Sequence, residues 1–224
     1  MPSVTPARLT VWSDYLCPWC YNAAVRLERM QDEFGSRLEI EWRAFLLRPH
    51  PPGAPAGFPS EDDPPRRVSA EALAKFRQYT ESWRRPGAEV DSGAFQPWQT
   101  ETPPPSHSVP PQVAAKAAAS LGPGAFRALH RRLLSAYFGE NRDVSARSTL
   151  RALWAEAGLD GRHFERCDDP ALLAATLREH EQAAELGVTG VPAASMEGNG
   201  TVVLGANPIA LYRRWIERTL DGRI

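Results

Sequence analysis

The chain has 224 residues, of which 42% are hydrophobic and 24% are charged, enough for one large domain or for a domain with an inserted subdomain. Twenty-six basic residues against 27 acidic ones give a formal net charge of −1, so charge provides no reason to expect nucleic acid or a membrane surface as a partner. The sequence also lacks a long apolar stretch and the charged, apolar start of a signal peptide, and we therefore expect a cytoplasmic protein.

The first part of the chain predicts a β-α-β unit. Residues 8–12 are typical of a short strand, and residues 18–34 predict a helix because Pro18 suits a first helical position and Gly35 a helix end. Residues 38–43 alternate between apolar and polar side chains and lead into the apolar residues 45–47, as expected for a strand that enters a covered sheet. The helix between the strands implies that they run parallel.

The middle of the chain predicts helices joined by proline-rich connections. Prolines gather in residues 49–65 and 97–111, where each proline removes a backbone donor and opposes regular structure. For the first of these stretches a disordered linker is the alternative. Helices are predicted from apolar spacing over residues 69–85, 110–122, 125–138, 145–157 and 170–186.

The end of the chain predicts a hairpin and a closing helix. Residues 193–197 and 201–204 are two strand candidates, and Gly198-Asn199-Gly200 between them is a strong signal for a tight turn. Asn207 and Pro208 are typical of the N-cap and first turn of a final helix. The predicted order is thus β-α-β, several helices, then β-β-α.

Only three cysteines are present, too few for a secreted disulfide scaffold, and two of them stand in Cys17-Pro18-Trp19-Cys20. A helix that begins at Pro18 puts Cys17 at its N-cap, where unpaired backbone N–H groups and the positive end of the helix dipole favour thiolate over thiol. Cys20 lies one turn deeper on nearly the same face, so it is placed to resolve a mixed disulfide formed at Cys17. Trp19 offers a flat apolar surface beside the reactive sulfur.

A cysteine pair at this spacing also occurs as half of a zinc site. Such sites need a second cysteine or histidine pair, whereas the remaining cysteine, Cys167, stands alone and the five histidines are scattered. We therefore predict no metal and no bound cofactor, and we expect Cys167 to be a packing residue.

A second motif precedes the hairpin. Residues 187–192 read Gly-Val-Thr-Gly-Val-Pro, and proline is permitted at the first residue of a strand. A cis bond between Val191 and Pro192 would expose the backbone groups of Val191 at the edge of a site, ready to pair with an extended peptide. Together with the cysteine pair, this segment predicts a substrate-binding edge.

Several other side chains have less certain roles in the sequence. Asp14 is expected to be a solvated or capping residue of a loop, and His107 a surface residue. Tyr21 either lines the site with Trp19 or packs in the core. Core positions are expected for three tryptophans: Trp12, Trp42 and Trp154.

Four segments together resemble the DsbA-like thioredoxin-fold family, and within it the FrnE-like branch: residues 13–21, 42–49, 187–192 and 205–208. The resemblance covers about residues 9–220. It implies an α/β thioredoxin fold formed by residues 8–47 and 187–222 and interrupted by a large helical insertion, residues 48–186. It also implies that Cys17 and Cys20 are the redox-active pair and that Pro192 is a cis-proline packed against them.

The resemblance and the motifs together favour a DsbA-like protein-disulfide oxidoreductase. Its expected partners are thiol- or disulfide-containing proteins or small molecules, with glutathione as a candidate redox partner and with neither nucleic acid nor membrane. The direction of the reaction and the choice between monomer and homodimer stay open. Pro18 and Trp19, between the cysteines, and Val191 and Pro192 are expected to bind substrate and tune the redox potential.

Two other functions remain open. Kappa-class transferases and hydroxychromene-carboxylate isomerases belong to the same superfamily and share the helical insertion, so a glutathione-dependent isomerase or transferase is the first alternative. These relatives commonly place serine at the position that matches Cys17, and the intact cysteine pair argues against this alternative. The other is a peptide-binding or chaperone module that uses the cleft under the insertion.

Overall fold

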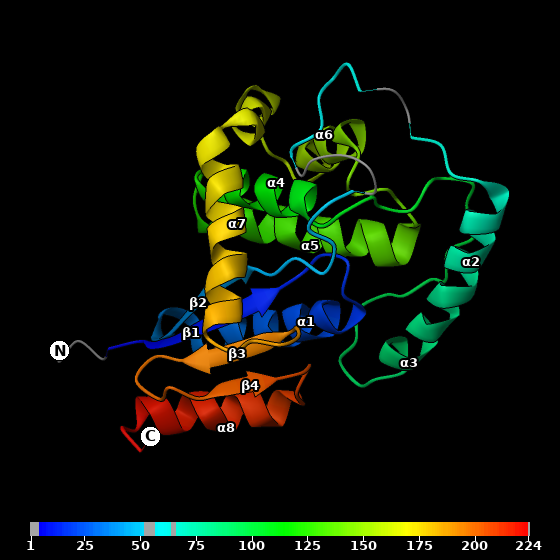
Figure 1. Ribbon diagram of the computed structural model, residues 1–224. Helices are drawn as coiled ribbons and strands as arrows, with labels where there is room; N and C mark the ends of the chain where they lie inside the picture. Colours follow the sequence, from blue (N-terminus) through cyan, green and yellow to red (C-terminus); the bar gives the residue numbers. More distant parts are fainter. Residues whose placement is uncertain (1–4, 52–56, 64–65, 224) are drawn as a thin grey trace.

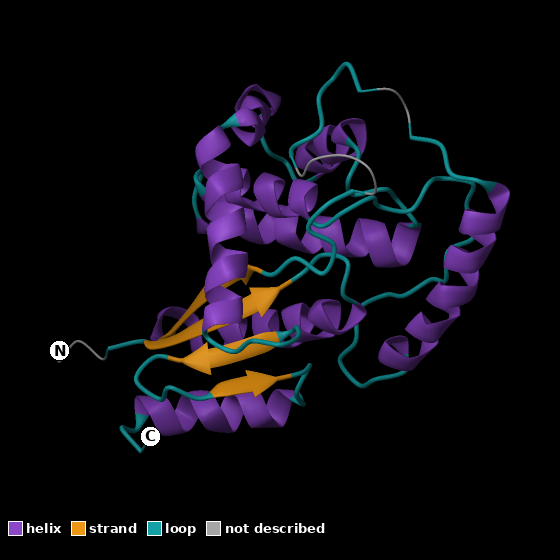
Figure 2. Ribbon diagram, viewed as in Figure 1, coloured by secondary structure: helices purple, strands orange, loops and turns teal. Residues whose placement is uncertain are grey.

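The computed structural model describes residues 5–51, 57–63 and 66–223. Helices surround a four-stranded sheet with the strand order β2-β1-β3-β4 (Figures 1 and 2). In chain order the elements are β1 (Ala7–Ser13), α1 (Pro18–Phe34), β2 (Leu38–Ala44), α2 (Ala70–Thr80), α3 (Arg84–Gly87), α4 (Val109–Ala119), α5 (Pro123–Glu140), α6 (Arg147–Glu156), α7 (Pro170–Glu185), β3 (Ala193–Met196), β4 (Val202–Leu204) and α8 (Ile209–Leu220). The fold is a thioredoxin fold with a helical insertion between β2 and β3.

The sheet confirms the predicted topology. β1 runs parallel to β2, with Val11 opposite Trp42, and antiparallel to β3, with Val11 opposite Ala194. β3 and β4 form the predicted antiparallel hairpin. The strand order places β1 inside the sheet, between β2 and β3.

Two sets of helices cover the two faces of the sheet. Because neighbouring side chains of a strand point to opposite faces, Val11 packs with Leu27 of α1 and Tyr212 of α8. Trp12 on the other face packs with Ala183 near the end of α7. In Figure 1 α7 descends from the upper helices and crosses the sheet, and α8 lies at the bottom. Helix α1, which carries the cysteines, thus lies on one face of the sheet together with α8, and α7 covers the other face.

The largest apolar core belongs to the helical insertion and extends into the thioredoxin part. Trp83, Tyr137 and Phe138 are fully buried in it, together with Tyr15 and Tyr21, which flank the cysteine motif. The insertion therefore packs directly against the region that carries Cys17. The predicted division at residues 48 and 186 remains a prediction.

The structure corrects the predicted end of the second strand. β2 ends at Ala44, and the apolar residues 45–47 do not continue it. The backbone N–H groups of Leu46 and Leu47 donate instead to the side chains of His180, at 3.2 Å from Nδ1, and of Asp14, at 2.6 Å from Oδ2. The chain leaves the sheet here because side chains from other segments take its hydrogen bonds.

Two helix boundaries also differ from the prediction. The helix expected over residues 69–85 ends at Thr80 and continues as a 3₁₀ turn before the short α3, where Pro86 has no N–H for a regular helical bond. Asn207 does not cap α8; its side chain donates to the carbonyls of Leu204 and Gly205, and α8 begins at Ile209.

The irregular connection predicted after residue 97 is confirmed up to residue 107. In the first proline-rich stretch, residues 52–56 and 64–65 lie outside the described residues.

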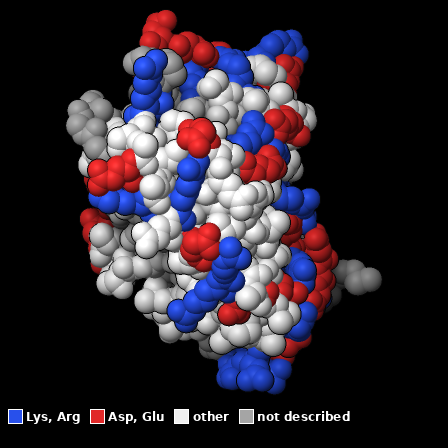
Figure 3. Space-filling model, turned by 90° about the vertical axis from the view of Figure 1, so that its right-hand side faces the viewer, with Lys and Arg blue, Asp and Glu red and all other residues white. Residues whose placement is uncertain are grey.

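Charged side chains are mixed over the surface that Figure 3 shows. Lysine and arginine alternate there with aspartate and glutamate, and many of them form ion pairs, such as Arg213 with Glu33 at 2.7 Å. This face therefore lacks the continuous positive potential that binds nucleic acid. Among the described residues, no helix combines the length and the apolar composition needed to cross a bilayer.

Candidate active site

Cys17 occupies the N-cap of α1, as the sequence predicts. Its backbone is extended (φ −97°, ψ 116°) while Pro18 begins the helix, and its carbonyl accepts hydrogen bonds from Cys20 N at 3.0 Å and Tyr21 N at 3.3 Å. The first-turn N–H groups and the helix dipole are therefore directed at the N-cap side chain. The Cys17 side chain makes no capping hydrogen bond to these groups.

The segment around Pro192 lies against Cys17. The Val191–Pro192 peptide bond is cis, and Cys17 Sγ donates to the Val191 carbonyl at 3.4 Å. The Pro192 carbonyl accepts from Gly205 N at 2.7 Å, which ties this turn to the end of β4. Residues 174 positions apart in the chain thus meet at the reactive sulfur.

Cys20 is fully buried behind Cys17. Its Sγ accepts a hydrogen bond from the backbone N–H of Asp14 at 3.5 Å, and both cysteines are free thiols. Burial and the adjacent Cys17 sulfur raise the pKa of Cys20 well above its usual range. Of the two thiols, Cys20 is therefore the more enclosed, with none of its surface exposed against 5% for Cys17.

Asp14 is more closely integrated into the site than the sequence suggests. Its carboxyl group is fully buried rather than solvated, and it accepts from Leu16 N at 2.7 Å and from Leu47 N at 2.6 Å. Burial raises the pKa of this carboxyl group. The expected capping role is absent, because the bond to Leu16 closes a local turn before the N-cap of α1. The link to Leu47 joins the segments that follow β1 and β2 and has no local sequence signal.

The loop before Cys17 is also held by a buried tyrosine. The Tyr15 hydroxyl and His130 Nδ1 of α5 lie 2.7 Å apart, and the two rings meet edge to face with centroids 5.3 Å apart. No local pattern in the sequence indicates this contact, because the two residues are 115 positions apart. Their contact fastens the active-site loop to the helical insertion.

The residues between and beside the cysteines differ in exposure. Pro18 and Trp19 are half-buried, and the Arg85 guanidinium carbon lies 6.0 Å from the centre of the Trp19 ring. Tyr21 faces the core instead and stacks on Phe138 with ring centroids 5.6 Å apart. Of the two aromatic candidates, Tyr21 is therefore a core residue, and Trp19 is the one that keeps part of its surface exposed.

Two further residues lie away from the cysteine pair. His107 is buried rather than on the surface, because its ring bonds to Ser106 Oγ at 2.8 Å and to the Gly57 carbonyl at 3.2 Å. Cys167 is buried among apolar side chains, and burial raises its pKa to about 12, as suits a packing residue. Within residues 5–51, 57–63 and 66–223, no three His, Cys, Asp or Glu side chains are grouped as metal ligands.

These features define a thioredoxin-like protein with a cysteine pair at a helix N-terminus opposite a cis-proline. The family of DSBA-like thioredoxin domains matches residues 8–84 and 102–217, which is most of the chain. The chain belongs to this family. No curated protein sequence matches it.

Solved structures of similar fold include both oxidoreductases and an isomerase. The cytosolic disulfide reductase DsbM from Pseudomonas aeruginosa has 21% sequence identity and a TM-score of 0.71, with 96% of this chain and 98% of that chain covered. The thiol-disulfide exchange protein alpha-DsbA2 from Wolbachia pipientis has 11% identity and a TM-score of 0.57, with coverage of 97% and 83%. A 2-hydroxychromene-2-carboxylate isomerase has 17% identity and a TM-score of 0.57, with 95% of each chain covered.

Proposed function

We propose that this chain is a cytoplasmic thiol–disulfide oxidoreductase in which Cys17 is the nucleophile and Cys20 the resolving thiol. The observation that carries the proposal is the placement of Cys17 Sγ at the N-cap of α1, 3.4 Å from the Val191 carbonyl, with Cys20 buried behind it. Family membership supports redox chemistry at this pair. The cytosolic location of DsbM, a protein of similar fold, supports the proposed compartment.

The reaction on a substrate disulfide proceeds in two exchanges. The Cys17 thiolate attacks one substrate sulfur, a Cys17–substrate disulfide forms, and the other substrate sulfur leaves as a thiolate that takes up a proton. Cys20 then loses its proton and attacks Cys17 Sγ, which releases the second substrate thiolate and leaves a Cys17–Cys20 disulfide. The second exchange needs the mixed disulfide as its electrophile, and the raised pKa of the buried Cys20 keeps this thiol protonated before that step.

The edge formed by Val191 and Pro192 is proposed to orient the substrate. The Val191 carbonyl already faces Cys17 Sγ, so a peptide that pairs with this backbone brings its own sulfur to the same place. Trp19, half-buried between the two cysteines, is proposed to supply an apolar surface for the substrate. Val191 and Pro192 thus position the substrate, and the two sulfurs exchange the bonds.

Glutathione is the proposed small-molecule thiol that returns the oxidised pair to the reduced state. Two glutathione thiols would open the Cys17–Cys20 disulfide and leave as glutathione disulfide, so the two electrons balance. A structure of DsbM with GSH, at 22% identity and a TM-score of 0.70, supports glutathione as a partner. A redox titration of the pair against glutathione measures the direction that the chain favours.

The test is a comparison of three serine variants. We expect Cys17→Ser to abolish glutathione-dependent reduction of insulin, and Cys20→Ser to accumulate a stable mixed disulfide at Cys17 that mass spectrometry detects. Cys167→Ser is the matched control, because this buried cysteine lies away from the pair, and it should retain full activity. Full activity of Cys17→Ser would contradict the proposal.

A second candidate is supported by the similarity of the fold to 2-hydroxychromene-2-carboxylate isomerase. A glutathione-dependent isomerase needs one residue at the position of Cys17 and has no use for Cys20. Isomerase turnover that survives in Cys20→Ser, combined with no loss of insulin reduction in either variant, would favour this second function. The buried, hydrogen-bonded Cys20 favours the first.

A further inference from the structure

A cavity outside the cysteine site lies between α1, β2 and α5. Its volume is about 320 Å³, which falls at the lower end of the range for small-molecule sites. Its lining includes Tyr21, Ile40, Trp42 and Phe126 but none of Cys17, Cys20, Val191 and Pro192. The cavity is therefore separate from the proposed redox site.

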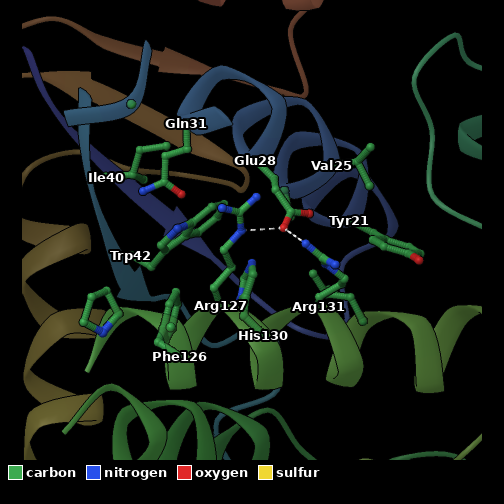
Figure 4. A pocket seen from close by; sticks show the side chains of 15 residues that line it. Tyr21, Val25, Glu28, Gln31, Ile40, Trp42, Phe126, Arg127, His130 and Arg131 are labelled. Atoms are coloured by element: carbon green, nitrogen blue, oxygen red, sulfur yellow. Dashed lines mark hydrogen bonds and ion pairs between the residues drawn. The ribbon is translucent and has the colours of Figure 1, made fainter. Parts of the chain in front are cut away.

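The polar groups of this cavity come from one face of α5. Arg127, His130 and Arg131 are spaced three and four residues apart, so they share a face of the helix, and Figure 4 shows the imidazole between the two arginines, directed towards α1. Arg127 Nε donates to Glu28 Oε1 at 2.7 Å, and Arg131 bonds to the same oxygen. Arg131 has no other hydrogen-bond partner among the described residues, so most of its donors are available to a ligand.

His130 provides the observation that points to a ligand. The residue is more than nine-tenths buried, and its Nε2 has no hydrogen-bond partner among the described residues. Burial raises the pKa of Tyr15, so its hydroxyl stays protonated, and His130 Nδ1 is its only hydrogen-bond contact among the described residues. Burial also lowers the pKa of His130 to about 4, so the ring is neutral and carries one proton. Because a proton on Nδ1 would leave both the Tyr15 hydroxyl and Nε2 unpaired, we assign the tautomer in which Tyr15 donates a hydrogen bond to Nδ1 and the ring proton lies on Nε2. A buried N–H donor without an acceptor is costly, and this one belongs to a residue that lines a cavity.

The apolar walls indicate the shape of the ligand. The Trp42 and His130 ring centroids lie 4.5 Å apart, and Phe126 stacks on His130 at 5.1 Å with an angle of 22° between the ring planes. A planar aromatic group fits walls of this kind. A carboxylate on that group would supply the acceptor that His130 lacks and the anion that Arg131 favours.

We propose that the cavity between α1, β2 and α5 binds a small aromatic carboxylate, with its ring against Trp42 and Phe126 and its carboxylate on His130 Nε2 and Arg131. Because His130 also contacts Tyr15, a single residue, His130, would connect this ligand to the loop that precedes Cys17. The site needs neither cysteine for binding.

The test uses 2-naphthoate as the probe and isothermal titration calorimetry with the full chain. We expect saturable binding that weakens about tenfold or more in both His130→Phe and Arg131→Gln, since each variant removes a hydrogen bond to a charged group. Arg213→Gln, which alters an arginine on α8 outside the cavity, is the matched control and should bind like the parent. Cys17→Ser should also bind like the parent, which separates this site from the redox site.

Ligand analogues test the two parts of the proposal separately. Neutral 2-naphthamide should bind more weakly than 2-naphthoate if the carboxylate matters, and octanoate should bind more weakly if the aromatic walls matter. Because Arg131 is 61% exposed at its side chain, Arg131→Gln is expected to fold normally even if His130→Phe does not. No saturable binding, equal binding of the amide, tighter binding of octanoate or unchanged binding in Arg131→Gln would each overturn the proposal.

Discussion

Identical side chains acquire different chemistry at Cys17 and Cys20 because their surroundings differ. Cys17 faces the N-terminus of α1 and a backbone carbonyl, whereas Cys20 is enclosed and receives one backbone N–H from Asp14. The proposed nucleophile and the proposed resolving thiol therefore differ in their position on one helical turn. Sequence spacing predicts this arrangement, since it depends on local helix geometry.

Asp14 gives a prediction for the dependence of stability on pH. Its pKa is raised by burial, and a carboxyl group whose pKa is higher in the folded than in the unfolded chain stabilises the fold at low pH, a contribution that is lost as the pH rises through the folded value. Asp14→Asn is neutral throughout. We therefore expect the stability of this variant relative to the parent to increase as the pH rises from the ordinary pKa of an aspartate to the raised value in the fold, by about 1.4 kcal/mol for each unit by which the pKa is raised.

Urea unfolding of both proteins at several pH values measures this difference. The hydrogen bond that asparagine loses adds an offset that does not vary with pH, so the slope and not the offset carries the prediction. Glu185→Gln, at an exposed side chain of α7, is the control for removal of a carboxylate and should show a much flatter difference. A stability difference between Asp14→Asn and the parent that is constant with pH would contradict the role of burial.

At the scale of single residues, the sequence predicts where a residue lies in its helix or turn better than it predicts whether the residue is buried. Cys17 at the N-cap follows from a local motif, the cis bond before Pro192 is implied by the family resemblance, and the structure has both. The burial of Asp14 and His107 is missed because it arises from contacts with Leu47 and Gly57, which are distant in the sequence. A polar residue in a loop carries no local sign that other segments will cover it.

Among the elements, α1 is predicted over its full length because its own residues mark both ends. Pro18 begins it, and the backbone N–H of Gly35 closes it at a positive φ of 56°. The end of β2 is not predicted, since the bonds that stop the strand come from His180 and Asp14. Boundaries set by local chemistry are thus visible in the sequence, and boundaries set by tertiary hydrogen bonds are not.

Arg26 joins α1 to two loops and provides a prediction at this scale. Its side chain is almost fully buried, and its guanidinium group donates to the carbonyls of Ala206 at 2.7 Å, Asn207 at 3.1 Å and Val90 at 2.9 Å. Arg26→Met would leave these acceptors without their donor. We expect a loss of about 2–4 kcal/mol in the free energy of unfolding, measured by urea denaturation.

Arg29 on the same helix is the matched control. Its side chain is 54% exposed and pairs with Asp91, so Arg29→Met is expected to change stability by less than about 1 kcal/mol. Equal losses in the two variants would show that charge on α1, rather than the buried bonds of Arg26, stabilises the fold.

At the scale of the whole molecule, the insertion and the thioredoxin part share one apolar core. Tyr15, Leu16 and Tyr21 of the cysteine segment belong to the same cluster as Trp83 and Phe138 of the insertion. The order of elements predicts β-α-β, several helices and then β-β-α, and the family resemblance implies that this is an interrupted thioredoxin fold. The sequence does not predict this shared core, because the contacts join residues more than 60 positions apart.

Phe138 tests whether the two parts unfold together. It is fully buried, stacks on Tyr21 and meets Trp83 at a centroid distance of 4.9 Å. We expect Phe138→Ala to cost about 3–5 kcal/mol and to shift two transitions equally: loss of helical circular dichroism and exposure of Cys17 and Cys20 to alkylation.

Both transitions are best followed in urea with Cys167→Ser as the background, so that alkylation reports only the active-site pair. Leu211→Ala is the control, because Leu211 is 41% exposed on α8 and its truncation leaves the shared core intact. Since the core extends from α5 to the loop before Cys17, a single coincident transition is expected in every variant. Alkylation of the cysteines that stays at the parent urea concentration while the helices unfold earlier would show that the insertion unfolds independently.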